Sequence, residues 1–272
     1  MVRWRRTVSF AVLFWALLAA SLQGTSLASP PSDTASVVLL KRSIMVGDPG
    51  GNMRWDETMS RAEAVKALIS AIGLTPGRSL SAQLVMRDVG SWHWAEKWIG
   101  VAAETGIGRG YADGLFRPDQ PITLAEYAVM LARAYVVLGG RPSEAKSLEV
   151  EPVWAAGELS RVEPVRRWLG LGTGPCPSLD FPVTRAQAGD LLFKALQEFG
   201  LAFDMTGSLV AVNVEERSVE IEVSSQVVRL EMAADARVLL NGSLVGLSEV
   251  PLNARARVVL CSAGVCAVLV VE

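Results

Sequence analysis

The chain has 272 residues, half of them hydrophobic, and its 26 basic and 28 acidic side chains leave a formal net charge of −2. Three cysteines are too few for a disulfide scaffold, so the chain must fold mainly through a hydrophobic core. A chain of this length fits one or two domains.

The N-terminus reads as an export signal. Three arginines precede an apolar run from Phe10 to Ala20, and small residues follow up to Ala28. This pattern predicts a secretory signal peptide over residues 1–28. No later apolar run of about 18 residues follows, so we expect an exported product with no membrane segment after cleavage. Cleavage would leave 23 basic against 28 acidic side chains, which argues against general binding to nucleic acid.

A stretch in the middle of the chain repeats an earlier one without a gap. GYADGLFRPDQPITLAEY, which starts at Gly110, aligns with GDPGGNMRWDETMSRAEA, which starts 63 residues earlier at Gly47. Further matched pairs are Gly114 with Gly51, Arg117 with Arg54, Asp119 with Asp56, Thr123 with Ser60, and Glu126 with Glu63. DFPVTRAQA, which starts at Asp180, repeats the end of the pattern, so one supersecondary unit occurs three times.

Each unit is predicted to contain two helices joined by a loop. The units span about residues 34–74, 86–139 and 148–201, and in the third unit residues 153–170 form the first helix. Helices this short, each with one apolar stripe, are not stable alone. We therefore predict an all-α bundle with approximate threefold symmetry over residues 34–203.

The second helix of each unit is predicted to begin with a capping box. In such a box a hydroxyl accepts from the backbone N–H three residues on, while the Glu or Gln there reaches back to the N-cap N–H. Losing one cap typically costs about 1 kcal/mol. The three boxes are Ser60-Arg-Ala-Glu63, Thr123-Leu-Ala-Glu126 and Thr184-Arg-Ala-Gln187.

Two of these boxes contain an arginine that capping does not explain, Arg61 and Arg185. A cation in the first helical turn opposes the helix dipole, but beside free backbone N–H groups it makes an anion site. A solvated arginine is the alternative. Under either hypothesis, Arg61→Ala should change the free energy of unfolding by no more than about 0.5 kcal/mol.

The middle unit resembles the S-layer homology (SLH) domain. The segment MRDVGSWHWAEKWIGVAAETGIGRGYADGLFRPDQPITLAE, from Met86 to Glu126, follows the family pattern closely, and the first and third units follow it more weakly. In that family three repeats form one pseudo-threefold bundle. Grooves between the repeats bind secondary cell-wall polysaccharide, typically with a pyruvylated sugar. The resemblance implies the same fold, glycan partner and surface location here, with no cofactor.

The resemblance also implies candidate binding residues. Arg61 and Arg185 would pair with a pyruvate carboxylate, and the other pattern residues fall on Asp88, Trp94, Gly110 and Tyr111. Leu124 replaces the arginine of the second box, and the third unit lacks the glycine-tyrosine loop. Fewer than three grooves should therefore be competent, and a copy that folds without binding glycan is the alternative.

The tryptophans that follow the signal peptide all lie in the repeats. Packing between helices explains most of them, and one or two could be exposed and stack on a sugar. They are Trp55, Trp92, Trp94, Trp98, Trp154 and Trp168.

The last part of the chain, residues 205–272, changes character. Short valine-rich runs separated by turn signals predict a small antiparallel β-barrel or sheet of five or six strands. It has no tryptophan or tyrosine for stacking on bases or sugars, so a spacer or a module for an envelope protein partner is expected. Cys261 and Cys266 flank a tight turn, where a disulfide could form or both thiols stay free, and Cys176 is unpaired in either case.

The sequence favours a binding module over an enzyme. The one histidine, His93, has no cysteine or hydroxyl motif near it, so we expect neither catalysis nor a metal there. The acidic pair Glu215 and Glu216 falls in a predicted hairpin turn as solvated charge. Two alternatives stay open: a structural envelope or spore-surface component that acts through protein contacts, and a glycan-degrading enzyme.

Overall fold

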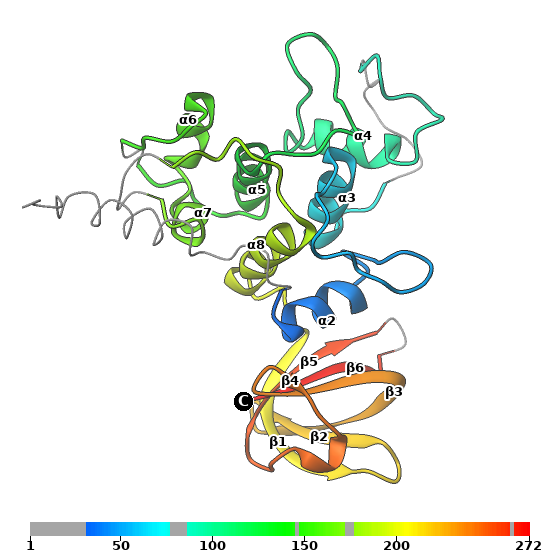
Figure 1. The fold of residues 1–272 in the computed structure, drawn as a ribbon. Helices are drawn as coiled ribbons and strands as arrows, with labels where there is room; N and C mark the ends of the chain where they lie inside the picture. The colour runs from blue at the N-terminus through cyan, green and yellow to red at the C-terminus, as the bar shows by residue number, and fades with distance from the viewer. Residues whose placement is uncertain (1–30, 77–85, 145–146, 172–176, 262–263) are drawn as a thin grey trace, which may run out of the picture.

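The computed structural model describes residues 31–76, 86–144, 147–171, 177–261 and 264–272, so the predicted signal peptide lies outside the described residues. A helical part is followed by a β-barrel, and the protein is therefore of the α+β class (Figure 1). The helices are α2 (Asp33–Lys41), α3 (Arg61–Ala71), α4 (Glu96–Glu104), α5 (Leu124–Val137), η1 (Val153–Ala155), α6 (Ala156–Leu159), α7 (Glu163–Trp168) and α8 (Arg185–Glu198). The strands and a short 3₁₀ turn are β1 (Met205–Asn213), β2 (Ser218–Val223), β3 (Gln226–Leu240), β4 (Ser243–Leu244), η2 (Leu247–Glu249), β5 (Arg255–Leu260) and β6 (Cys266–Val271). No helix within the described ranges is both long enough and apolar enough to span a membrane.

All three predicted capping boxes are present, at the starts of α3, α5 and α8. In the first box the N–H of Glu63 donates to the Ser60 hydroxyl at 3.2 Å, and the N–H of Ser60 donates to the Glu63 carboxylate at 2.9 Å. These local bonds satisfy N–H groups that have no partner inside the helix, and so they fix where each helix begins.

The three segments that precede the boxes are joined in a closed ring of backbone hydrogen bonds. The N–H of Met59 donates to Val183, that of Val183 to Ile122, and that of Ile122 back to Met59, each at 2.9 Å. All three residues are buried. The box segments therefore form a cycle rather than a row.

The first turn of each box helix is also bound to the loop of another unit. Two successive backbone N–H groups donate to carbonyls of that loop at 2.9 to 3.0 Å in every case. The donor–acceptor pairs are Arg61 to Gln120, Ala62 to Pro118, Leu124 to Phe181, Ala125 to Leu179, Arg185 to Glu57 and Ala186 to Trp55.

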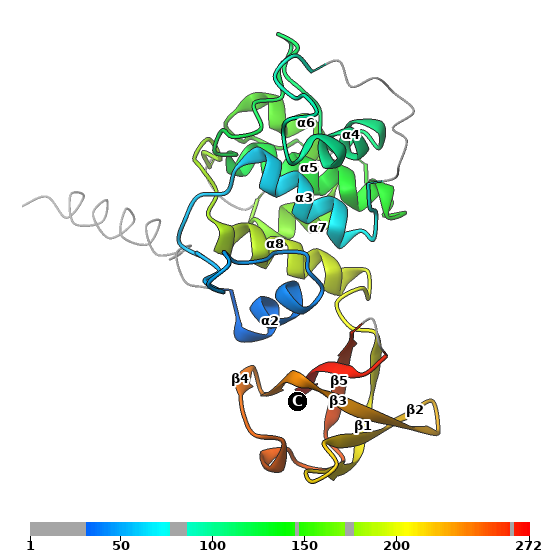
Figure 2. The same ribbon diagram turned by 90° about the vertical axis from the view of Figure 1, so that its right-hand side faces the viewer.

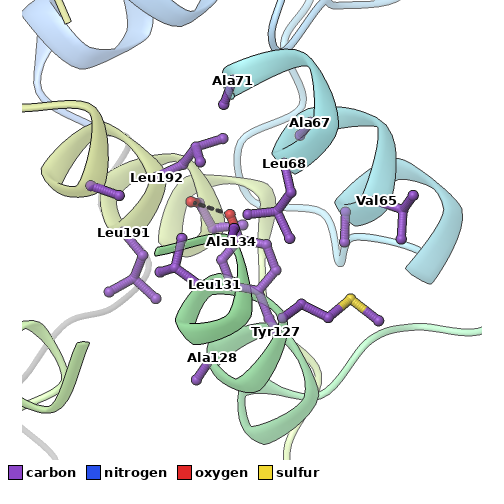
Figure 3. Close-up of a cluster of buried hydrophobic side chains, with 14 of the residues drawn as sticks. Val65, Ala67, Leu68, Ala71, Tyr127, Ala128, Leu131, Ala134, Leu191 and Leu192 are labelled. Carbon is purple, nitrogen blue, oxygen red and sulfur yellow. Dashed lines mark hydrogen bonds between the residues drawn. The ribbon is translucent and has the colours of Figure 1, made fainter. Parts of the chain in front are cut away.

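Side chains of α3, α5 and α8 meet in the centre of the helical part, where Leu68, Leu131 and Leu192 pack together (Figure 3). Tyr127 is fully buried among them, and its hydroxyl donates to the carbonyl of Ala188 at 2.9 Å. A buried phenol needs such a partner, because an unsatisfied hydroxyl in an apolar core is destabilising.

The first helical segment of the third unit differs from the prediction of one helix over residues 153–170. The structure has three short pieces instead, η1, α6 and α7, and the break falls at Ser160–Val162. Pro164 explains the break, because a proline inside a continuous helix would clash with the carbonyl four residues earlier and could not donate to it.

The C-terminal strands form a closed barrel. Five strands pair in the circular order β1-β2-β3-β6-β5, and β4 adds to the edge of β3. The predicted all-antiparallel pairing is wrong for one pair, because β3 and β6 are parallel. The connection between these two strands passes through β4, η2 and β5, and this crossover brings the chain back in the same direction.

The barrel packs directly against the helical part. Both views show α2 between α8 and the barrel (Figure 1, Figure 2). Outward-facing barrel residues such as Leu239 and Val268 belong to the same buried cluster as the helices. Arg42 of α2 also forms an ion pair with Asp204 at 2.9 Å.

The considered disulfide is not formed, because Cys261 and Cys266 are both free. Cys266 lies opposite Leu260 in the sheet and faces the barrel interior. Cys261, which follows Leu260 in the chain, packs against the cluster of the helical part. Successive residues along an extended chain point to opposite sides, which agrees with the two thiols being unbonded. Cys176 lies outside the described residues.

Candidate functional site

A groove of about 270 Å³ opens beside α3. Its walls come from the loop before α3, from the outer face of α3 and from the start of α8. The charged and aromatic side chains that line it are Arg54, Glu63, Lys66, Trp94 and Arg185. This cluster is called the Arg185 groove below.

Arg185 forms one wall of this groove and is only 4% exposed. Its Nε donates to the carbonyl of Met53 at 2.8 Å, one terminal nitrogen donates to Glu63 at 2.9 Å, and the other donates to the carbonyl of Val46 at 2.8 Å. A guanidinium has five N–H donors, so two remain for a ligand. Arg185 is thus held by the protein but keeps donor capacity.

Lys66 projects into the same groove from α3, one turn after Glu63. Its ammonium donates to the carbonyls of Ser43 and Ile44 at 2.6 and 3.0 Å. Burial, and secondarily the positive charge of Arg185, lower the pKa of Lys66 below its usual range. One of its three N–H donors remains unused, and Lys66 has no carboxylate partner within the described residues.

Arg54 also lines the Arg185 groove. It forms an exposed ion pair with Glu57 at 3.3 Å, and its Nε is buried without a hydrogen-bond partner among the residues that the structure describes. A buried donor without a partner is destabilising, so this nitrogen is a candidate ligand contact.

Trp94 gives the groove an accessible aromatic face. Its side chain is 58% exposed, and its ring stacks on that of His93, with 5.8 Å between centroids. His93 itself is buried and its Nε2 lies 3.3 Å from the Asp119 carboxylate. The described residues contain no group of three or more metal-ligating side chains, at His93 or elsewhere.

Arg61, the first residue of α3, lies in a second cluster with residues of the second unit. Its Nε donates to Phe116 at 2.9 Å, and its terminal nitrogens contact Arg109 at 3.3 Å and Glu126 at 3.2 Å. These partners stand 63 residues after those of Arg185, so the two arginines are held in the same way. Arg61 is 3% exposed.

Tyr111 distinguishes the second cluster from the Arg185 groove. Its ring covers Arg61, whose Cζ lies 4.6 Å from the ring centroid, and its hydroxyl donates to Glu126. Burial, then the bond to Glu126, raise the pKa of Tyr111, so the phenol stays protonated and donates. The first unit has Asp48 at the equivalent position, 63 residues earlier, and among the described residues no aromatic ring lies over Arg185.

Asp88 and Gly110 belong to the frame of the second cluster. The Asp88 carboxylate accepts from the N–H of Phe116 at 2.8 Å and of Arg117 at 2.6 Å; although burial opposes it, these bonds lower the pKa of Asp88. A side chain at Gly110 would place its Cβ 2.9 Å from the carbonyl oxygen of Leu115, so the turn requires glycine. Both residues shape the loop.

The six predicted site residues thus fall into two groups. The Arg185 groove brings together Arg185 and Trp94, whereas Arg61 and Tyr111 meet in the second cluster beside the loop framed by Asp88 and Gly110. The N–H groups expected to be free beside both arginines are not free, because they donate to loop carbonyls of other units.

Sequence reasoning missed Lys66 and Arg54. Lys66 lies three residues after the box glutamate, a spacing that puts both on one face of a helix. The sequence shows Arg54 only as a loop residue that recurs at Arg117. Neither position predicts a groove, because the other wall of the groove is formed by Arg185, more than a hundred residues away.

One segment of the chain matches a known domain family, and several known proteins are similar to part of the chain. Residues 86–128 match the model of the S-layer homology domain. The surface layer protein of Brevibacillus choshinensis is 30% identical over 138 residues, which are 49% of this chain and 12% of that protein. Cell surface glycoprotein 1 of Acetivibrio thermocellus is 29% identical over 110 residues, 40% of this chain and 5% of that protein. The cellulosome-anchoring protein of the same organism is 29% identical over 114 residues, 40% of this chain and 26% of that protein.

The chain spans no more than 26% of the length of these three relatives. The family match covers the second unit, from the Asp88 loop to the start of α5. The relatives bear the names of surface-layer, cell-surface and anchoring proteins. Within this chain, residues 86–128 are thus the segment that matches the S-layer homology domain.

Proposed function

We propose that this protein is exported and held non-covalently on the bacterial surface by binding an acidic secondary cell-wall polysaccharide. The Arg185 groove is the binding site in this proposal. The family match at residues 86–128 and the names of the relatives support anchoring at the cell surface.

The charge of the Arg185 groove carries the proposal. Three cations, Arg54, Lys66 and Arg185, line the groove. Glu63 is paired with Arg185 and Glu57 with Arg54, so Lys66 is the cation of the lining with no carboxylate partner among the described residues. Charge-assisted hydrogen bonds to a carboxylate are stronger than neutral ones, and an exposed indole offers a flat apolar surface for a sugar ring. The groove therefore suits a sugar that carries a carboxylate, such as a pyruvylated one.

The proposal includes a pseudo-threefold arrangement of the three units. The closed ring of backbone bonds through Met59, Ile122 and Val183 supports it, as do the equivalent bonds of each box helix to the next loop. In such an arrangement the Arg185 groove lies where units one, two and three come together, since α3, Trp94 and Arg185 belong to different units.

The second cluster has a supporting role in this proposal. Arg61, Asp88, Gly110 and Tyr111 were predicted to touch glycan, and that assignment stays a prediction. Their contacts with one another and with the loop favour a role in holding the second unit in shape.

We propose that the barrel is a spacer or docks an envelope protein. Its residues after Phe203 include no aromatic side chain, so stacking on sugar is not expected of it. Its packing on α2 would transmit force between the anchored helices and whatever the barrel holds.

The test is a pull-down of the full exported chain on purified cell-wall sacculi, with and without extraction of the secondary polysaccharide. We expect retention only on unextracted sacculi. Trp94→Ala should weaken retention, whereas Trp92→Ala, which removes an indole that is 74% exposed and lies outside the groove lining, should not.

Equal retention on extracted sacculi would contradict the proposal and favour an envelope component that acts through protein contacts. Release of soluble sugar from the sacculi would instead identify an enzyme. Equal effects of the two tryptophan substitutions would remove the Arg185 groove from the proposal and leave anchoring intact.

A further inference from the structure

The three box helices carry different residues at one equivalent position. The seventh residue, counted from the capping hydroxyl, is Lys66 in α3, Val129 in α5 and Asp190 in α8. In α3 this residue lines the Arg185 groove. The charge at this position therefore changes from positive to neutral to negative along the chain.

The arginine of the box varies as well. Arg185 stands against α3 and Arg61 stands against α5, but the second box, whose backbone N–H groups bond to the loop of the third unit, has Leu124 at this position. The helix α8 thus has an acidic residue at the seventh position and no arginine from a box opposite it. Burial raises the pKa of Asp190, which is the behaviour of a carboxyl with little cationic support apart from Lys194.

The side chain of Arg61 is contacted by other residues of the protein. Tyr111 covers Arg61 and bonds to Glu126, whose side chain is 14% exposed, against 30% for Glu63 in the Arg185 groove. Val129, at the seventh position there, is buried and offers no charge. The Arg61 guanidinium is therefore already covered by a ring and paired with a carboxylate.

Beside α3, an open groove, a box arginine and a second cation coincide. Because the guanidinium of Arg185 is fixed by Met53, Glu63 and Val46, its charge is largely balanced by Glu63. Lys66 is bound only to backbone carbonyls, so its charge is not balanced by a carboxylate within the described residues. The net attraction for an anion in the groove therefore depends on Lys66.

We propose that the anionic sugar binds in only one place per chain, the Arg185 groove, and that Lys66 is the residue that selects this groove over its two counterparts. This inference rests on the proposed function. In this inference Arg185, on α8, is a fixed wall of the site. Lys66, on α3 one turn after Glu63, is the group that recognises the negative charge.

The experiment is a calorimetric titration of the full exported chain with a pyruvylated fragment of wall polysaccharide, and with the same fragment after removal of the pyruvate. We expect a stoichiometry of one and at least about tenfold weaker binding by Lys66→Ala, since one charge-assisted bond is lost. Lys66→Arg should keep most of the affinity. Thermal melts confirm folding, because Lys66 is half-buried on a helix surface and alanine suits a helix.

Two matched variants serve as controls. Lys194→Ala removes the same charge from an exposed position on α8, and Asp190→Asn neutralises the equivalent position beside the third unit. Neither should change affinity by more than about twofold, because screening weakens distant surface charges.

The outcomes separate this inference from the proposed function. No binding by the unaltered chain would overturn both. Binding by the unaltered chain with a stoichiometry above one, or with Lys66→Ala equal to it, would overturn this inference alone. Equal affinity for the fragment without pyruvate would show that the sugar, not its charge, is recognised, and this too would overturn the role of Lys66.

Discussion

The ring of Tyr111 lies over the guanidinium of Arg61, with 4.6 Å between the Arg61 Cζ and the ring centroid. The Cζ of Arg117 lies 4.1 Å from the same centroid. One aromatic ring thus contacts two cationic side chains of the protein. Cation–π contacts of this kind stabilise most when the cation is desolvated. Arg61 of the first unit and Tyr111 of the middle unit, two of the candidate glycan-binding residues, therefore contact each other.

Arg61→Ala is expected to destabilise the protein by roughly 3 kcal/mol. The substitution leaves the Glu126 carboxylate without its arginine in a mostly buried place and removes the donors to Phe116 and Arg109. This replaces the value of about 0.5 kcal/mol that follows from the sequence pattern alone. Urea unfolding of the full chain measures the change.

Arg167→Ala is the control for that substitution. Arg167 forms ion pairs with Glu163 and Glu198, but its side chain is 55% exposed. Exposed pairs contribute about 0 to 1 kcal/mol, so this variant should unfold close to the unaltered protein. Equal losses in the free energy of unfolding for the two variants would contradict the prediction that the burial of Arg61 makes its ion pair more important.

Ser60→Ala should lower the free energy of unfolding by about 1 kcal/mol, because it removes the acceptor for the N–H of Glu63. Ser70→Ala lies in the same helix, where its side chain caps nothing, and should leave stability unchanged or slightly higher, since alanine is the better helix former. Thermal melts of the pair compare the two positions. A larger loss for Ser70→Ala would contradict the assigned cap.

Binding of the acidic fragment should weaken at alkaline pH before an ordinary lysine loses its charge. Burial and Arg185 lower the pKa of Lys66 below 10.5, and a bound anion favours the charged amine. Affinity is therefore complete below the lowered pKa and falls as the pH rises through it. Calorimetric titrations between about pH 7 and 10 follow this loss.

Lys66→Arg supplies the control for the pH profile. Arginine stays charged over this range, so its affinity should remain flat. The other charged groups that face Lys66 are Glu63 on α3, Arg185 on α8 and Arg54 in the loop, and none of these residue types changes charge there. A parallel loss of affinity in both proteins would place the titrating group elsewhere.

The cysteines should react with an alkylating reagent at very different rates. Cys266 is fully buried, and burial raises the pKa of its thiol to about 12, whereas Cys261 is partly exposed. The thiolate is the reactive form, so Cys261 should be labelled first in the folded protein and Cys266 only on unfolding. Peptide-resolved mass spectrometry checks this order. Recovery of a Cys261–Cys266 disulfide would contradict the opposite orientations of the two side chains.

The local part of this fold could be predicted from the sequence. A capping box is an interaction between residues three apart, so Ser60 and Glu63 are sufficient to define it. The valine-rich strands after Phe203 were predictable in the same way, because alternation and turn residues are local signals.

The partners of Arg61 and Arg185 could not be predicted, because they come from 55 and 132 residues away, at Phe116 and Met53. The arginine pattern indicated an anion site, but only the assembled structure supplies the carbonyls and the carboxylate that fix each guanidinium. The parallel pairing of β3 and β6 escaped prediction for a similar reason, because hydropathy does not report strand direction.

The ring formed by Met59, Ile122 and Val183 consists entirely of main-chain groups. Every residue except proline supplies the same N–H and C=O, so the hydrogen bonds of the ring do not depend on which side chains the three residues carry. The three units can therefore accumulate different substitutions and still close on one another. The third unit, which lacks the glycine-tyrosine loop, is held in the ring by the same main-chain bonds as the other two.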